Sequence, residues 1–153
     1  MPPPNACRTS PKCIDRFIGE YAFLSNFHRA SFAWAGVEWT TAEHAFQASK
    51  TLDDEQRERV RIARSPGAAK RLGRRVDLRP DWEDVKDDLM LEVLEAKYAV
   101  PELRAGLLAT GDAVLIEGNT WGDRYWGVCD GRGRNQLGVT LMRIREYIRR
   151  DHT

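Results

Sequence analysis

Apolar side chains recur at three- and four-residue steps along much of the chain, a spacing typical of amphipathic helices. The longest such stretch covers residues 82–100, with Asp81 as its predicted cap and Pro101 as its end. Thr40 and Thr41 can cap a helix through Lys50. Further helices are predicted over 53–64, 65–75, 102–110 and 136–150, the second of them opened by Ser65-Pro66 and the third closed by Gly111.

Strand signals are short and few. Residues 31–34 and 37–39 predict a hairpin that turns at Ala35-Gly36, and 14–19 and 113–116 are β-like. Aromatic and polar residues are mixed over 20–27, which suits a loop lining a site, and 121–138 is a glycine-rich loop. The sum predicts an α+β fold, a predominantly helical single domain with a few short strands. That domain is expected over 14–150, after a Pro-rich leader over 1–13.

Composition places this chain among globular proteins. It has 153 residues, of which 42% are hydrophobic and 31% charged. No apolar run approaches the roughly 20 residues that cross a bilayer, and no signal-peptide stretch precedes the domain, so we expect a cytoplasmic protein without membrane contact. Cys7, Cys13 and Cys129 have no metal-ligand spacing, which predicts free thiols, no metal and no cofactor.

Charge is balanced overall but uneven locally. A net charge of +1 argues against a non-specific nucleic-acid binder. The segment 64–79 nevertheless carries one acid, Asp77, against six basic residues: Arg64, Lys70, Arg71, Arg74, Arg75 and Arg79. Such a run is either a solvated helix face or a patch that holds phosphates, because the guanidinium fork matches phosphate oxygens.

Glu43 has two interpretations. Thr40-Thr41-Ala42-Glu43 is a capping-box pattern, in which Glu43 would only bind the backbone amide of Thr40. Alternatively, Glu43, Gln47 and Lys50 share one helix face and bring a carboxylate, an amide and an amine together. His44 points elsewhere and is expected to be structural.

Aromatic residues mark two further candidates. Trp82 is either a core anchor or an exposed indole that stacks on a base. The segment 116–127 gathers carboxylates, an amide and large aromatics between glycines, which is more than a loop needs for folding and suggests a ligand site.

Together these segments resemble the NADAR, or YbiA-like, family. The resemblance is carried by 19–27, by 39–50 with Glu43, by Trp82-Glu83-Asp-Val-Lys86 with Met90 and Lys97, by 108–111, and by Glu117-Gly-Asn, 123–127 and 133–138. It implies an N-glycosidase, which hydrolyses a bond between nitrogen and ribose C1, with catalytic positions at Glu43, Trp82 and Asp123. The Trp121-Gly122 insertion leaves the choice of substrate open.

The chemistry of N-riboside cleavage suggests a role for each residue. Asp123 is expected to stabilise the positive charge on the ribose, Glu43 to transfer the proton and Trp82 to stack on the base, although the two carboxylates could exchange roles. Lys50 could hold a phosphate or trap an opened ribose as an imine. Expected substrate-binding residues are Asn26, Phe27, Gln47, Lys50, Glu117, Asn119, Tyr125, Trp126, Arg134 and Asn135.

The expected partner is a small ribose-phosphate or ADP-ribosyl substrate, or an ADP-ribosylated nucleic acid that carries it. Removal of ADP-ribose from modified guanine is slightly favoured over hydrolysis of the phosphoribosyl intermediates of riboflavin synthesis. A module that binds ADP-ribose or a nucleotide without turnover is the rival. It does not explain two carboxylates, which repel a phosphate.

Overall fold

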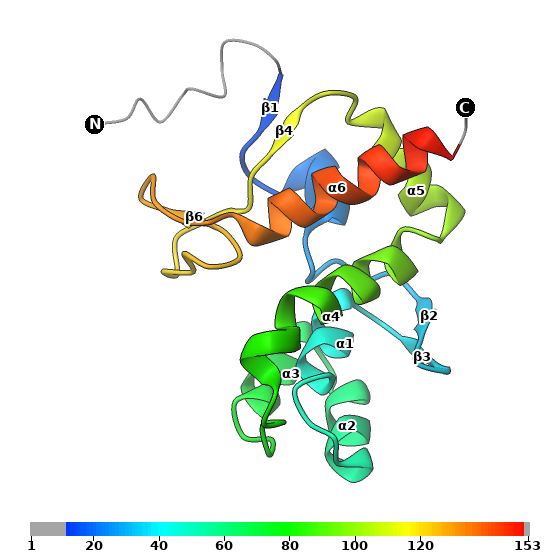
Figure 1. Ribbon diagram of the computed structural model, residues 1–153, viewed down its shortest axis with the longest axis vertical. Coiled ribbons are helices and arrows are strands. Elements are labelled where there is room, and N and C mark those ends of the chain that lie inside the picture. Colours follow the sequence, from blue (N-terminus) through cyan, green and yellow to red (C-terminus); the bar gives the residue numbers. More distant parts are fainter. Residues whose placement is uncertain (1–11, 152–153) are drawn as a thin grey trace. The chain divides into compact units, whose positions relative to one another are not determined.

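The computed structural model describes residues 12–151, which form two compact units (Figure 1). Unit 2 is continuous and runs from Asn26 to Val100, whereas unit 1 joins the chain up to Ser25 with the chain from Pro101 onward. The predicted leader lies almost wholly outside the described residues. No helix within 12–151 is both long and apolar enough to cross a membrane.

Unit 2 contains one hairpin and four helices. They are β2 (Phe32–Trp34), β3 (Val37–Trp39), α1 (Ala42–Ala48), α2 (Asp54–Arg61), α3 (Pro66–Gly73) and α4 (Trp82–Lys97). The strands are antiparallel with Phe32 opposite Trp39. Ala35 and Gly36 have φ values of 54° and 81°, the left-handed conformations that a tight hairpin turn requires. The predicted hairpin is therefore confirmed.

Side-chain caps fix where three of these helices begin. The side chains of Thr41, Asp53 and Ser65 each accept a hydrogen bond from the backbone N–H three residues later. Asp81 occupies the cap position of α4 but makes no such bond. Its carboxylate instead binds the Arg79 guanidinium, at 2.6 and 3.1 Å. The start of α4 is thus as predicted, whereas the capping role of the Asp81 side chain is wrong.

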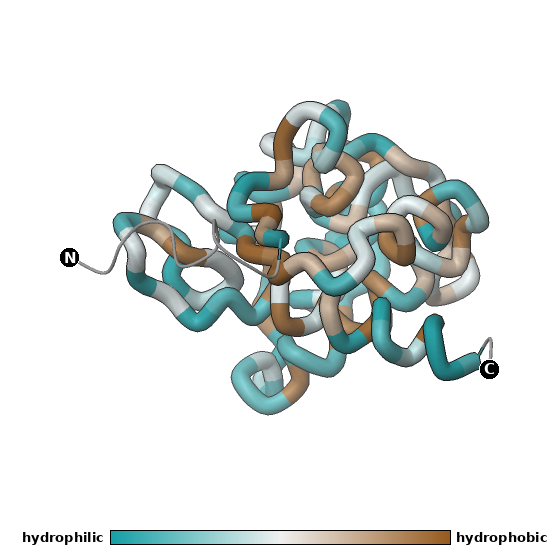
Figure 2. The backbone as a smooth tube through the Cα atoms, turned by 90° about the horizontal axis from the view of Figure 1, so that it is seen from above, coloured by the Kyte–Doolittle hydropathy of each residue, from teal (hydrophilic) through white to brown (hydrophobic). Residues whose placement is uncertain are grey.

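Helix α1 is the centre of unit 2. It packs against α2, α3 and α4, and every residue from Ala42 to Ala48 is buried. Hydrophilic and hydrophobic stretches alternate along much of the tube (Figure 2), as expected for elements with one exposed face. Polar side chains on a helix that is buried on all sides need hydrogen-bond partners within the protein. The partners of Glu43, His44 and Gln47 therefore show the role of each residue.

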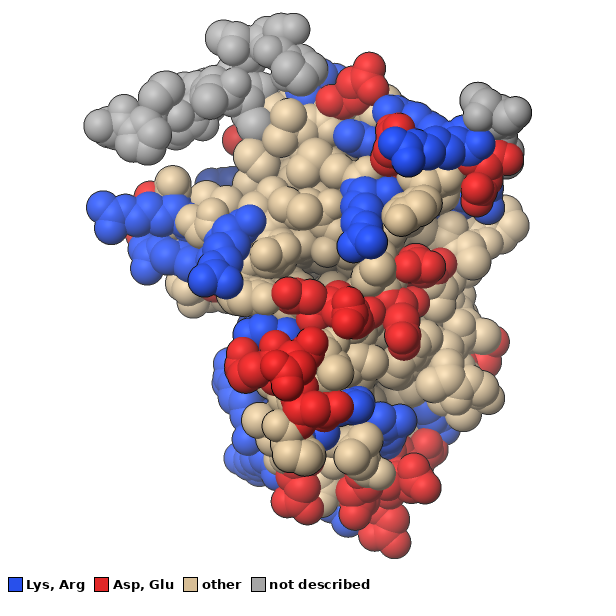
Figure 3. Space-filling model, in the orientation of Figure 1, with Lys and Arg blue, Asp and Glu red and all other residues tan. Residues whose placement is uncertain are grey.

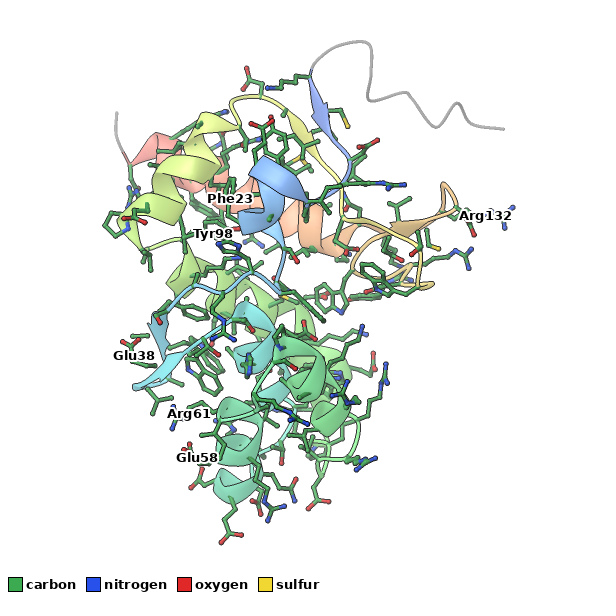
Figure 4. All side chains as sticks on the ribbon, turned by 180° about the vertical axis from the view of Figure 1, so that it is seen from behind. Phe23, Glu38, Glu58, Arg61, Tyr98 and Arg132 are labelled. Carbon is green, nitrogen blue, oxygen red and sulfur yellow. The ribbon has the colours of Figure 1, made fainter. Side chains whose placement is uncertain are left out.

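A buried lysine and tyrosine lie where α4 ends. Lys97 and Tyr98 are almost completely inaccessible, and Lys97 Nζ lies 5.1 Å from the centroid of the Tyr98 ring. Tyr98 is labelled in Figure 4. Burial lowers the pKa of Lys97 from 10.5 to about 7 and raises the pKa of Tyr98 above its usual range.

The buried lysine makes stability depend on pH. Between pH 7 and pH 10.5 Lys97 is protonated in the unfolded chain but not in the folded one, so the free energy of unfolding rises with pH across this window. We expect Lys97→Met to flatten the rise, measured by urea unfolding from pH 6.5 to 9.5. Lys12→Met, at an exposed lysine, is the control. Parallel pH dependences for wild type and Lys97→Met would contradict the buried neutral amine.

Unit 1 contains a 3₁₀-helix, two helices and short paired strands. They are β1 (Cys13–Ile14), η2 (Gly19–Leu24), α5 (Pro101–Ala109), β4 (Val114–Leu115), β5 (Gly118–Asn119), β6 (Val128–Cys129) and α6 (Gln136–Arg150). Strand β1 pairs in parallel with β4, and β5 pairs in parallel with β6. Helix α6 packs on α5 and β4, and η2 packs on α5, where the Phe23 ring (Figure 4) lies against Gly106.

Three expectations for unit 1 need correction. The predicted strand over 14–19 pairs only at Ile14, and its second half is unpaired. Gly19 then takes a left-handed φ of 60° and opens η2, where a loop is predicted. Cys13 is disulfide-bonded, so the expectation of a free thiol is wrong there, although Cys129 is free and buried. The α+β class with a helical majority is confirmed.

Candidate functional site

Glu43 is a buried carboxylate held by an amide. The N-cap of α1 is Thr41, whose hydroxyl accepts from the His44 N–H at 3.1 Å. The capping-box position therefore falls on His44, one residue beyond Glu43. Glu43 is 7% exposed, and its Oε1 accepts a hydrogen bond from Gln47 Nε2 at 2.7 Å. The structure brings the predicted Glu43–Gln47 pair together.

The His44 side chain connects α1 to the segment after α2 through hydrogen bonds. Its Nε2 lies 2.8 Å from the carbonyl oxygen of Ala63, which can only accept, so Nε2 carries the proton. Its Nδ1 lies 2.7 Å from Thr41 Oγ1 and accepts from that hydroxyl. Burial lowers the pKa of His44. A neutral imidazole used at both nitrogens ties α1 to the end of α2, as expected for a structural residue.

Trp82 is packed rather than exposed. Trp82 is 8% exposed, and its ring centroid lies 5.2 Å from the ring centroid of Phe46. Lys50 Nζ lies 5.8 Å from the centroid of the Trp82 ring. The expected exposed indole face is therefore not observed, and the core-anchor interpretation fits the geometry. The Lys50 amine over this ring also lies close enough to Glu43 for that carboxylate to act on its pKa.

Removing this anchor should destabilise the protein. Trp82→Ala deletes a buried indole and leaves a cavity beside Phe46, so we expect a loss of about 3–5 kcal/mol in the free energy of unfolding. Chemical denaturation followed by circular dichroism measures it. Trp121→Ala is the matched control, because Trp121 is 63% exposed. Equal losses in the two variants would show that burial of Trp82 does not stabilise the fold.

Acidic side chains over α4 and the basic segment 64–79 are two charged regions of unit 2. Acidic side chains gather over α4 (Figure 3), all of them exposed: Glu83, Asp84, Asp87, Asp88, Glu92 and Glu95. In the basic segment 64–79, Arg79 is neutralised by Asp81. Burial lowers the pKa of Lys50, and the charges of Arg74 and Lys70 lower it further while Glu43 opposes them. The Lys50 amine thus lies near the charges of Lys70 and Arg74 and near the carboxylate of Glu43. We call Lys50, Lys70 and Arg74 the cationic group.

Asn26 presents a buried amide with an unused acceptor. Its backbone oxygen accepts from the Glu43 N–H at 3.0 Å, which places it beside the start of α1. Its Nδ2 lies 3.6 Å from Met90 Sδ, and its Oδ1 is buried without a hydrogen-bond partner among the described residues. An asparagine in this state is available to a ligand. The next residue, Phe27, is exposed.

Asp123 lies in unit 1, in the loop between β5 and β6. Its Oδ1 accepts from the backbone N–H groups of Tyr125 and Trp126 at 3.1 and 2.9 Å. The Asn119 amide binds the backbone N–H and C=O of Asp123 at 3.1 and 2.8 Å. Oδ2 has no hydrogen bond within the described part of the chain. One oxygen therefore orients the carboxylate and leaves the other for chemistry.

The rest of this loop is built around two amides and a glycine. Asn119 Nδ2 also donates to Glu117 Oε2 at 3.0 Å. Asn135 uses its amide on backbone, accepting from the Glu117 N–H and donating to the Leu115 carbonyl, both at 2.9 Å. This geometry fits a structural role for Asn135 better than substrate contact. A Cβ at Gly127 would lie 1.8 Å from Glu117 Oε2, so glycine is needed there.

Aromatic and cationic side chains stack at the end of the loop. The Tyr125 and Trp126 rings meet edge to face at 4.8 Å, and the Arg134 guanidinium lies 5.4 Å from the Tyr125 ring centroid. Arg134 is exposed, so this stack is accessible to a planar or anionic ligand.

Each unit carries one share of the predicted site. Unit 2 holds Asn26, Phe27, Glu43, Gln47, Lys50 and Trp82, and unit 1 holds Glu117, Asn119, Asp123, Tyr125, Trp126, Arg134 and Asn135. Within 12–151 no cluster of His, Cys, Asp and Glu could hold a metal. Gly73, which contacts Gln47, is not predicted, because a glycine near the end of a helix suggests only a terminator.

Comparison with known proteins gives consistent matches. The NADAR domain family model matches residues 16–149. N-glycosidase YbiA of Escherichia coli (strain K12) is 44% identical over 133 residues, which cover 84% of this chain and 82% of that protein. The Riboflavin biosynthesis protein VVA0006 of Vibrio vulnificus is 37% identical over 132 residues, 84% of this chain but 36% of that protein.

A solved structure matches as well. The NMR structure of the E. coli protein YbiA superposes with a TM-score of 0.83 at 39% identity, covering 97% of this chain and 92% of that one. This similarity confirms the predicted YbiA-like fold.

Proposed function

The chain belongs to the NADAR domain family, and from this premise we propose that it is an N-glycosidase that removes ADP-ribose from modified guanine. Hydrolysis of an N-glycosyl bond is the activity in the name of its YbiA relatives. In that reaction the bond between ribose C1 and nitrogen breaks, the oxygen of water bonds to C1, and the nitrogen leaves with a proton.

The observation that carries the proposal is the buried carboxylate of Glu43 near Lys50, the central member of the cationic group. A carboxylate that transfers a proton benefits from burial and from a fixed hydrogen bond, and Glu43 has both. The cationic group supplies positive charge for a phosphate-bearing sugar. A binding module would need the cations but gains nothing from the carboxylate.

Asp123 is suited to the second role. Positive charge develops on C1 and the ring oxygen of the ribose as the bond breaks, and a fixed negative charge stabilises it. The two backbone N–H groups on Oδ1 hold the Asp123 carboxylate in place before substrate arrives. We assign charge stabilisation to Asp123 and proton transfer to Glu43.

Two more side chains of unit 2 complete the proposal. The unpartnered Oδ1 of Asn26 would accept a hydrogen bond from a ribose hydroxyl, which removes the cost of its burial. Lys50 would bind a phosphate oxygen. Its lowered pKa also makes the amine available as a nucleophile that could hold an opened ribose as an imine.

A smaller substrate is the second candidate. Relatives named riboflavin biosynthesis proteins match this chain, the Vibrio vulnificus protein at 37% and the chloroplastic Zea mays protein at 36% identity. A phosphoribosyl intermediate carries a single phosphate and would use the same two carboxylates. The exposed arginines in the last turn of α3 and just after it, Arg71, Arg74 and Arg75, favour the larger ADP-ribosyl group, which brings a pyrophosphate.

The test is release of free ADP-ribose from an oligonucleotide that carries ADP-ribosylated guanine. We expect release by the wild-type protein and release that is at least about a hundredfold slower by Glu43→Gln. Binding of ADP-ribose without release would replace the enzyme with a binding module. If neither is observed, and a phosphoribosylamino-pyrimidine is hydrolysed instead, the second candidate is correct.

A further inference from the structure

We propose that Gly73 and Gln47 act together as positioning residues for Glu43, with the bare backbone of Gly73 providing the space in which the Gln47 amide lies as it binds the carboxylate. This inference rests on the proposed role of Glu43 in proton transfer. Gly73, in α3, thereby helps to orient the carboxylate of Glu43, which belongs to α1.

The geometry of Gly73 leaves no room for a side chain. A Cβ built on Gly73 would lie 1.9 Å from Gln47 Oε1, 2.8 Å from its Cδ and 3.0 Å from its Cβ. Gly73 is the last residue of α3 and is buried, and its φ is not in the left-handed region. Glycine is therefore required by the side chain of Gln47 and not by the backbone.

The Gln47 amide occupies a buried position where it does not favour folding. It is 5% exposed, and its Oε1 is buried without a hydrogen-bond partner in the described chain. Burying an unsatisfied carbonyl is unfavourable, and a methionine of the same length would avoid it. Among residues 12–151, the hydrogen bond of this side chain is the Nε2 donation to Glu43 Oε1 at 2.7 Å. The amide is explained if that N–H is needed.

Donation from a neutral amide favours the ionised form of the carboxylate and fixes its direction. When the donor moves away, Glu43 ionises at higher pH. The limb of the pH profile that Glu43 governs then moves to higher pH, whether Glu43 acts as base or as acid. A residue that only supported the fold would not move it.

The experiment compares Gly73→Ala with Gly67→Ala in the same helix. A Cβ at Gly67 meets nothing closer than 3.7 Å, so this substitution should leave turnover unchanged. We expect Gly73→Ala to lower kcat about tenfold to a hundredfold and to move the Glu43 limb to higher pH. Equal kcat values and pH profiles in the two variants would overturn the proposal.

A double variant tests the steric coupling. Gln47→Ala alone should lose the same activity. Gly73→Ala added to it should cost little further, because alanine at position 47 lacks the Oε1 and Cδ atoms that the new methyl group would meet at 1.9 and 2.8 Å. If the single Gly73→Ala variant does not fold, the double variant still should. A double variant that also fails to fold would show that the clash is not with Gln47.

A measurement without substrate separates this proposal from the proposed function. The ¹³C chemical shift of the Glu43 carboxyl, followed through a pH titration by NMR, gives its midpoint in each variant. A midpoint raised in Gly73→Ala and Gln47→Met but not in Gly67→Ala supports positioning, even if no glycosidase activity is found. An unchanged midpoint overturns positioning, even if the wild-type protein releases ADP-ribose.

Discussion

Glu43→Gln is expected to lower kcat by about a hundredfold to ten-thousandfold, the range that loss of one proton-transfer group produces, and to leave the fold intact. The glutamine carbonyl occupies the place of Oε1 and can still accept from Gln47 Nε2, so the packing of α1 is retained. Single-turnover release of ADP-ribose measures the chemical step, and thermal unfolding checks the fold.

The control is Glu38→Gln, the same change at an exposed glutamate of the hairpin (labelled in Figure 4). It should retain wild-type turnover and stability. Near-normal turnover by Glu43→Gln would show that this carboxylate only serves the structure of α1. A large loss of stability in Glu43→Gln would assign the same structural role.

Asp123→Asn should lower kcat by about a hundredfold to a thousandfold with little change in stability. The asparagine retains an oxygen for the N–H groups of Tyr125 and Trp126, so the loop keeps its conformation. What it loses is the negative charge on the free oxygen. Because that charge acts on the ribose as the bond breaks, kcat should fall more than KM rises.

Asp130→Asn controls for a loss of charge elsewhere in unit 1. Asp130 is exposed and has a left-handed φ of 53°, which asparagine tolerates, and its ion pair with Arg124 is long, at 3.8 Å. It should keep its activity. A rise in KM for Asp123→Asn at unchanged kcat would instead make Asp123 a substrate-binding residue. Asp123→Ala should add a loss of stability, because it removes both backbone hydrogen bonds.

The elements that the sequence predicts well are those defined by local pattern. Helix caps such as Ser65-Pro66 and the left-handed pair Ala35-Gly36 act within a few residues and are visible in the sequence. The two-residue strands β1 and β4 are different, because their pairing joins Cys13 to Val114, about a hundred residues apart. No local pattern fixes such a partner, so the extent of β1 is overestimated.

In the candidate site, too, features set by nearby residues are predictable from the sequence and features set by distant residues are not. Proximity of Glu43 and Gln47 follows from helix periodicity, and the structure bears it out. Whether Glu43 or His44 completes the cap depends on a shift of one residue in the start of α1, which two adjacent threonines leave open. Burial of Trp82 depends on Phe46 of α1 and on Lys50, which follows that helix. The need for glycine at position 73 depends on a side chain outside α3 and has no signal in the sequence.

The division of the chain into a continuous and a discontinuous unit bears on the order of events during synthesis. Unit 2 uses only residues 26–100, so its hairpin and four helices can assemble as soon as Val100 has left the ribosome. Unit 1 must wait, because β1 emerges early but its partner β4 follows only after the whole of unit 2. Glu43 is thus expected to be in its folded surroundings while Asp123 is still being translated, and slow closure of β1 on β4 should limit the final step of folding.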